Sequence, residues 1–299
     1  MVTGTVRRAG FVALAGRPNV GKSTLTNAIV GAKVAIVSDR PQTTRRAIRG
    51  VANGPDWQLV LVDLPGVQRP LDALTSRMQK SVVREVADAD AALLLLNGQE
   101  GVGPGDRYIA QALRSARVPI TIAVNKMDRL RPERQAQALL DAAGLSADEA
   151  DIFPVSARTG VGVGPLVAHL VELLPAGPSL YETGQRSDMA LEEMLAELIR
   201  EQVLRRTFQE VPHAVGVVLE DLEAVHDDLH RIRGLIWVET ESQKGILIGA
   251  GGRMIKAIGS AARRELERML GTRVHLDLSV RVRRHWRTDD GLLDRLGID

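Results

Sequence analysis

Short apolar runs alternate with segments of helical periodicity from the N-terminal region to about residue 175. This rhythm predicts an α/β fold with a mostly parallel, doubly wound sheet. The expected strands are Phe11–Ala15, Gln58–Asp63, Ala91–Leu96, Ile120–Asn125 and Asp151–Val155. Ligands of such sheets bind beyond the carboxyl ends of the strands, so the distinctive residues that follow these runs are the candidate site.

A glycine-rich motif, Gly16-Arg-Pro-Asn-Val-Gly-Lys-Ser23, follows the first run and opens an expected helix over Thr24–Val30. It matches the G-x-x-x-x-G-K-S/T phosphate loop, whose backbone N–H groups and helix N-terminus favour an anion. Lys22 is expected to contact the β- and γ-phosphates, and the Ser23 hydroxyl to bind Mg²⁺. The expected nucleotide-binding residues here are Gly16, Arg17, Pro18, Asn19, Val20, Gly21, Lys22, Ser23 and Thr24.

The base is indicated by the tetrapeptide Asn125-Lys126-Met127-Asp128, which ends a later apolar run. It resembles the N-K-x-D guanine signature, in which the aspartate accepts from the ring N–H and the exocyclic amine of guanine. Adenine lacks that donor pair and would leave the carboxylate unpaired. Ser156-Ala157 resembles the weaker final guanine-contact motif. GTP and GDP are therefore the expected substrate and product.

Asp63-Leu64-Pro65-Gly66 resembles the D-x-x-G motif, in which the aspartate orients Mg²⁺ through water and the glycine N–H senses the γ-phosphate. The polar loop Val37–Arg46 resembles switch I. Thr44, or with less support Thr43, would coordinate Mg²⁺ when the γ-phosphate is present, which predicts an order–disorder switch. The expected catalytic residues are Lys22, Thr44, Asp63 and Gly66, and the expected metal ligands are Ser23, Thr44 and Asp63.

A breaker-rich stretch, Pro175–Gly184, predicts a domain boundary. We expect a GTPase domain over residues 1–175, a linker over 176–187 and a second domain over 188–299. In the second domain we expect a helix over Asp188–Phe208 with Asp188 as N-cap, and an antiparallel pair from Ala214–Leu219 and Arg231–Thr240 joined by a charged loop. A glycine cluster, a helix over Arg253–Leu270 and a strand over Arg273–Arg281 complete it.

The glycine cluster resembles the I-G-x-x-G loop of a KH domain, whose bare backbone clamps about four nucleotides. The order of elements is similar to the prokaryotic, type II α+β variant of that fold. Between Lys244 and Arg287, eleven Lys and Arg residues stand against three acidic residues, a local charge that attracts polyanions. Trp286 could stack on a base or be buried. The expected RNA-binding residues are Ile248, Gly249, Ala250, Gly251, Gly252, Arg253 and Lys256.

The composition limits the class of protein. The chain has no cysteine, so disulfide frameworks and thiolate metal sites are excluded. Neither a signal peptide nor an apolar run of about 20 residues is evident, which predicts a cytoplasmic protein. A membrane-associated or signalling GTPase whose basic C-terminal domain binds anionic lipid is the alternative function. The charges there are spread over loop, helix and strand instead of one amphipathic helix, which favours RNA.

Together, G-R-P-N-V-G-K-S, Q-T-T-R, D-x-P-G and N-K-x-D, followed by a KH module, resemble the Era family over roughly Gly10 to Arg287. That resemblance implies a bacterial GTPase that engages the 3′ end of small-subunit (16S) ribosomal RNA and assists maturation of that subunit. It also implies some peripheral association with the inner membrane, and we expect a monomer. Leu64 departs from the family's usual D-T-P-G, and Arg45-Arg46 leaves the effector contacts open.

Two positions bear on the reaction. Val67 occupies the place where Ras-like enzymes have a water-orienting glutamine, so we expect slow intrinsic turnover. Related GTPases use an asparagine at the position of Asn19 to hold K⁺ near the phosphates. A turn-forming asparagine without an ion is an equally good interpretation.

Overall fold

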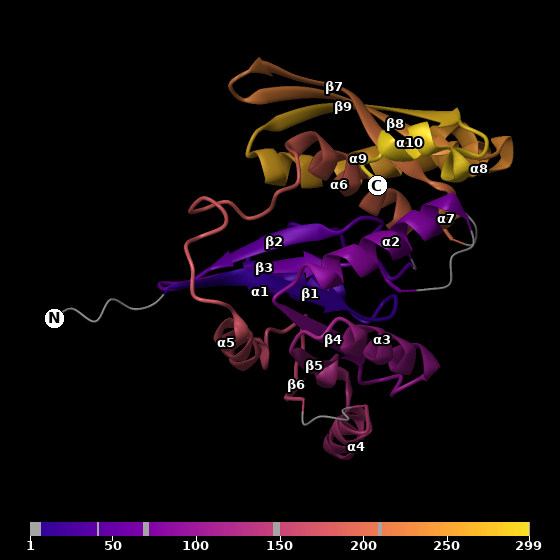
Figure 1. Cartoon of the computed structure of the whole chain (residues 1–299). Helices are drawn as coiled ribbons and strands as arrows, with labels where there is room; N and C mark the ends of the chain where they lie inside the picture. Colours follow the sequence, from indigo (N-terminus) through magenta and orange to yellow (C-terminus); the bar gives the residue numbers. More distant parts are fainter. Residues whose placement is uncertain (1–6, 41, 68–71, 146–149, 209–210, 299) are drawn as a thin grey trace. The chain divides into compact units, whose positions relative to one another are not determined.

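The computed structural model describes residues 7–40, 42–67, 72–145, 150–208 and 211–298. These residues form two compact units (Figure 1). The first contains residues 7–35, 44–67 and 78–188, and the second contains residues 36–43, 72–77 and 189–298. None of the helices formed by these residues combines the length and the hydrophobicity that a membrane span requires.

The first unit contains a six-stranded sheet in the order β2-β3-β1-β4-β5-β6. Its strands are β1 Arg8–Ala15, β2 Ile48–Asn53, β3 Trp57–Asp63, β4 Ala91–Asn97, β5 Ile120–Asn125 and β6 Ile152–Pro154. All neighbours are parallel except β2 and β3. The predicted doubly wound sheet is confirmed. Strand β2 was not predicted, because its sequence I-R-G-V-A-N is short and interrupted by arginine and glycine.

Alternate residues of the central strands face two hydrophobic clusters. Ala13 and Ala15 of β1 belong to one cluster, and Val12 and Leu14 belong to the other. The helices that pack against the strands in these clusters are α1 Lys22–Val30, α2 Ala73–Ala87, α3 Pro104–Ser115, α4 Pro132–Ala143 and α5 Val163–Leu173. Helices α2, α3 and α4 contribute to the first cluster, and α1 and α5 to the second. This two-sided burial explains why the strands are continuously apolar.

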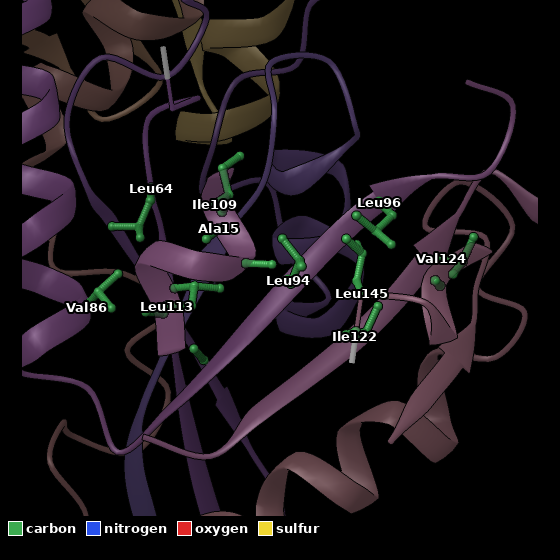
Figure 2. Close-up of a cluster of buried hydrophobic side chains, with 14 of the residues drawn as sticks. Ala15, Leu64, Val86, Leu94, Leu96, Ile109, Leu113, Ile122, Val124 and Leu145 are labelled. Atoms are coloured by element: carbon green, nitrogen blue, oxygen red, sulfur yellow. The ribbon is translucent and has the colours of Figure 1, made fainter. Parts of the chain in front are cut away.

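Figure 2 shows the first cluster and explains one departure from the expected motif. Leu64, which follows β3 within Asp63–Gly66, is completely buried among these side chains. Val86 of α2, Ile109 and Leu113 of α3 belong to the same cluster. The apolar side chain therefore adds buried core area at a position where the motif itself needs only backbone geometry.

The breaker-rich stretch after α5 is an ordered strap of the first unit. The buried side chain of Gln58 accepts from the N–H groups of Leu180 and Tyr181 at 2.7 and 2.9 Å. Further along, Val51 of β2 donates to the carbonyl of Arg186 at 2.8 Å. The two units separate after Asp188.

The second unit has a three-stranded sheet in the order β7-β8-β9, with β7 antiparallel and β9 parallel to β8. Helices α6 and α9 share one cluster with this sheet, and the end of the chain packs with Val218, Leu235 and Trp237 in another. Its elements are α6 Leu191–Arg206, α7 Val211–Ala214, β7 Gly216–His226, β8 Leu229–Val238, α8 Glu241–Ile248, η2 Ala250–Gly252, α9 Arg253–Leu270, β9 Arg273–Val282, η3 Trp286–Thr288 and α10 Asp290–Asp294. The predicted KH-type element order is confirmed.

Three local predictions were wrong. Helix α6 begins at Leu191 with Ala190 as N-cap, and Asp188 instead accepts from Arg49 at 3.1 Å. The charged residues expected in a loop largely extend β7 to His226, because their side chains lie on the exposed face of a hairpin. Thr240, expected to end a strand, is the N-cap of α8, since its hydroxyl accepts from the N–H of Gln243 at 3.2 Å.

Candidate functional site

The phosphate loop lies where doubly wound sheets bind ligands. Strand β1 is paired with β3 on one side and β4 on the other, so the strand order changes direction at β1. The loop leaves the carboxyl end of β1 and enters α1. Gly16 has a φ of 157°, and a Cβ atom there would lie 2.6 Å from the carbonyl oxygen of Leu95. Close backbone packing therefore requires glycine at this position.

Two buried charges face each other behind the loop. The Lys22 ammonium donates to the carbonyl oxygens of Gly16 and Arg17, both at 3.0 Å. Burial lowers the pKa of Lys22 to about 8, and the Asp63 charge opposes that shift. Burial likewise raises the pKa of Asp63 to about 6. The positive charge of Lys22, and then the nearby Ser23 hydroxyl, oppose that increase. The cost of burying each charge is thus partly offset by the other.

The three expected Mg²⁺ ligands provide oxygen atoms of the kind that Mg²⁺ prefers. The hydroxyl oxygens of Ser23 and Thr44 are 2.9 Å apart. Both carboxylate oxygens of Asp63 are buried, and neither has a hydrogen-bond partner in the described part of the chain. Thr43 instead donates its hydroxyl to the carbonyl of Arg40 at 2.6 Å. The oxygen atoms of Ser23, Thr44 and Asp63 fit the ligand chemistry of a magnesium ion, which these residues would hold.

The guanine motifs are joined to the phosphate loop. Asn125 Nδ2 donates to the carbonyl of Val20 at 2.8 Å, and Lys126 Nζ donates to the carbonyl of Asn19 at 2.8 Å. The N–H of Ala157 donates to Asn125 Oδ1 at 2.9 Å. The structure therefore brings the motifs at residues 16–24, 125–128 and 156–157 together.

The Asp128 carboxylate is held by two side chains. Ser156 Oγ donates to Oδ1 at 2.7 Å, and the exposed Arg158 donates to Oδ2 at 2.6 Å. The Ser156 hydrogen bond, and secondarily Arg158, keep the pKa of Asp128 below its ordinary value. Arg158 was not among the expected site residues. Its position directly after Ser156-Ala157 was the available signal.

Some expected nucleotide-binding residues bury their side chains elsewhere. Met127 and Leu64 belong to the first hydrophobic cluster, and Val20 belongs to the second. Only their backbone groups remain for a nucleotide. Val67 also packs against the first cluster and presents no polar side-chain atom. Gly66 packs closely against the phosphate loop, because a Cβ atom there would lie 2.9 Å from Pro18 Cγ.

The candidate RNA loop joins α8 to α9. Gly249, Gly251 and Gly252 have φ angles of 71°, 59° and 76°, which glycine adopts without strain. A Cβ atom at Gly251 or Gly252 would meet no described atom within 4 Å, so the backbone there is open. The side chains of Ile248, Arg253 and Lys256 are exposed. Arg253 donates from Nε to the carbonyl of Ala250 at 3.2 Å, which places its guanidinium over the loop.

A groove of about 630 Å³ is lined mainly by α9, the helix that follows this loop, and by β9. It is lined from α9 by Ile255, Lys256, Gly259, Ser260, Arg263 and the acidic Glu267, from β9 by Arg273, Val274, His275, Leu276 and Leu278, and from β8 by Leu229. Sequence reasoning identified Lys256 but not the other members. For the members on α9, the helical spacing of Lys256, Gly259, Ser260 and Arg263 was a usable signal. Trp286 is fully buried and donates to the carbonyl of Ala214 at 2.9 Å, so it is a core residue and does not stack on a base.

The switch-like loop is divided between the units. In the second unit, the N–H of Val37 donates to buried Glu201 of α6 at 3.0 Å, and buried Arg200 donates to the carbonyl of Thr43. The next residue, Thr44, belongs to the first unit and contacts Ser23 there. Thr43 and Thr44 are consecutive residues whose partners lie in different units.

The fold and the two sets of motifs define a P-loop GTPase that carries a KH module. A family model described as a 50S ribosome-binding GTPase matches residues 11–126, and a KH domain model matches residues 210–287. The chain is 45% identical over 294 residues to the GTPase Era of Mycobacterium tuberculosis, covering 97% of this chain and 98% of the relative. The Mycobacterium avium GTPase Era is 44% identical with the same coverage. The chain belongs to the Era family.

Solved structures agree with this assignment. The structure of Era with MgGDPNP and nucleotides 1506–1542 of 16S ribosomal RNA superposes with a TM-score of 0.93, at 33% identity over 98% of this chain and 99% of the other. An Aquifex aeolicus Era variant bound to GDP·AlF4⁻ also has a TM-score of 0.93, at 32% identity over 97% of this chain and 99% of the other.

Proposed function

We propose that this protein binds and hydrolyses GTP with Mg²⁺, binds the 3′ region of small-subunit ribosomal RNA, and assists assembly of that subunit. The observation that carries the GTPase part is that Lys22, Asn125 and Lys126 all donate to carbonyls of one loop. The RNA part is supported by the open Gly251–Gly252 backbone and by a groove of about 630 Å³ that Lys256 and Arg263 of the following helix help to line. The Era structure with a 16S ribosomal RNA fragment indicates which RNA to test.

Each group at the nucleotide site has a distinct task. Loop N–H groups and the Lys22 ammonium bind the phosphates, where negative charge develops during transfer. Ser23, Thr44 and Asp63 would hold Mg²⁺, which when bound neutralises charge on the β- and γ-phosphate oxygens. The Gly66 N–H would meet the γ-phosphate. Val67 cannot orient the attacking water, so we expect slow hydrolysis without a further partner.

Asn19 is either a ligand of a potassium ion or a turn residue without an ion, and an experiment can distinguish the two roles. Asn19 has a left-handed φ of 64°, and its carbonyl accepts from Lys126. If K⁺ binds here, the rate of GTP hydrolysis will be higher in potassium chloride than in sodium chloride at equal ionic strength. Equal rates would support the turn.

The RNA site is tested with a matched pair of variants at Gly251. Asp and Asn have the same size and both tolerate a φ near 60°, so strain is matched. Gly251→Asp adds a negative charge where phosphate would approach, and we expect it to weaken binding of a 16S 3′-end fragment at least about tenfold more than Gly251→Asn. GTP affinity should be unchanged in both. Equal RNA binding by Gly251→Asp and the unmodified protein would exclude this loop.

Two further experiments address coupling and membrane association. We propose that the nucleotide changes RNA affinity through the shared 36–44 segment, so RNA affinity should differ between GDP and a non-hydrolysable GTP analogue. Identical affinities would reject the switch.

Peripheral membrane association, implied by the family resemblance, is tested by flotation with anionic vesicles at the salt concentration used for RNA binding. Flotation that RNA does not compete away would favour a separate membrane function.

A further inference from the structure

The first half of the phosphate loop has an anchor of its own. Asn125 and Lys126 hold Val20 and Asn19 in the second half of the loop. In the first half, Arg17 Nε donates to the carboxylate of Asp106 at 2.9 Å. The Asp106 side chain is fully buried, and it lies in the first turn of α3. A charge buried this completely is costly unless it is paired, so the contact defines the position of Arg17.

The surroundings of this ion pair are built to hold one geometry. Asp106 Oδ2 also accepts from the N–H of Gly103 at 2.9 Å and thereby caps α3. The Arg17 guanidinium lies across the same turn, where a Cβ atom at Gly105 would be only 2.9 Å from Arg17 Cδ. A second acid, Glu100, lies 3.3 Å from Arg17 but is half exposed. The buried pair, and not the exposed one, can therefore fix the loop.

The backbone of the same arginine contacts the phosphate-binding lysine. Lys22 Nζ donates to the carbonyls of Gly16 and Arg17, both at 3.0 Å. Any shift of the Arg17 backbone would therefore move two acceptors of the Lys22 ammonium. We propose that Asp106 is a positioning residue for GTP hydrolysis, which acts through Arg17 on the placement of Lys22. This inference rests on the proposed GTPase function.

The test is a double-mutant cycle on the kcat for GTP hydrolysis by the full-length protein. Arg17→Met removes the link, and Asp106→Asn leaves one acceptor oxygen for two donors, Arg17 and Gly103. We expect each single variant to lower kcat by at least about tenfold, because small misplacements of a catalytic group are costly. In the double variant, kcat should be no lower than in Arg17→Met alone, since Asp106 has lost its route to Lys22.

A merely structural role predicts a different pattern. If Asp106 acts only as the cap of α3, its effects on kcat will multiply with those of Arg17→Met, and this result would overturn the proposal. An unchanged kcat in either single variant would also overturn it. Melting temperature reports the lost cap separately, since Asp106→Asn should lower it in both backgrounds.

Two controls complete the design. Arg17→Lys keeps a charge beside Asp106 and should recover part of the lost kcat, whereas no recovery together with normal melting would count against the ion pair. Glu100→Gln removes the exposed partner and should leave kcat within about twofold, as expected for exposed pairs. If Asp106→Asn does not fold, the Arg17 variants still decide. An inactive unmodified protein would refute the proposed function, whereas active, unaffected variants would refute this inference alone.

Discussion

The side-chain amide of Asn125 joins the end of β5 to the phosphate loop through a 2.8 Å hydrogen bond from Nδ2 to the carbonyl of Val20. Its Oδ1 accepts from the N–H of Ala157 at 2.9 Å. One buried side chain therefore satisfies main-chain groups of two other nucleotide motifs. The base and phosphate motifs therefore share this side chain as a support.

We expect Asn125→Ala to weaken both folding and nucleotide binding. It leaves the Val20 carbonyl and the Ala157 N–H unpaired, which costs about 1–3 kcal/mol in the free energy of unfolding. GDP affinity should fall at least about tenfold, because the loop loses its support. Asn97, which pairs in register with Asn125 and is equally buried, is the matched control. Calorimetry should show Asn97→Ala losing stability while it keeps GDP affinity, and equal GDP losses in both would contradict the prediction.

Asp128→Asn should change the base that is bound. The substitution replaces one of the two acceptor oxygens with an NH2 donor, which faces the exocyclic amine of guanine, so GTP affinity should fall by about 10²–10⁴. Xanthine presents a carbonyl where guanine has its amine, so xanthosine triphosphate should bind the variant more tightly than GTP does. Fluorescence competition between the two nucleotides measures this. If the variant still prefers GTP, the assignment of Asp128 to the base is wrong.

The low pKa of Asp128 predicts how GDP affinity depends on pH below neutrality. The carboxylate must be charged to accept from guanine, and the Ser156 hydrogen bond and then Arg158 hold its pKa below the ordinary value of an aspartate. It therefore stays ionised as pH falls from 7 to about 5, so binding should not weaken through this group over that range. Ser156→Ala removes the hydrogen bond that lowers the pKa of Asp128 most, so the pKa rises and the loss of GDP affinity should begin at a higher pH. GDP affinity measured across this pH range in both proteins tests the prediction. Coincident curves of affinity against pH would contradict it.

Gln58→Leu should release the strap without disturbing the nucleotide site. Gln58 is fully buried and also donates to the carbonyl of Tyr181 at 3.1 Å. Its loss leaves strap backbone groups unpaired, which costs about 1–3 kcal/mol of unfolding free energy per buried group. Hydrogen exchange at Leu180 and Tyr181 should accelerate while GDP affinity stays the same. Gln137→Leu, at an exposed side chain on α4, should change neither; unchanged exchange in Gln58→Leu would show that the strap is held otherwise.

Much of the candidate site could be predicted from the sequence because its motifs are local. Residues 16–24 and 125–128 carry their chemistry in contiguous segments that each follow an apolar strand. Strand β2 and the contacts of the strap could not be predicted, and the sequence could not decide whether Trp286 is buried. All three depend on partners distant in sequence. Gln58, for example, is 122 positions from the Leu180 N–H that it binds.

The sequence by itself determined the fold class, the nucleotide motifs and the glycine loop, because helical and strand periodicity and glycine-rich turns are properties of neighbouring residues. Tertiary structure decided which side chains support those motifs. Arg17 and Asp106 lie 89 positions apart, and neither residue is distinctive alone. Their relationship arises only when the turn after β1 and the first turn of α3 are packed together, which excludes water and makes an unpaired charge costly.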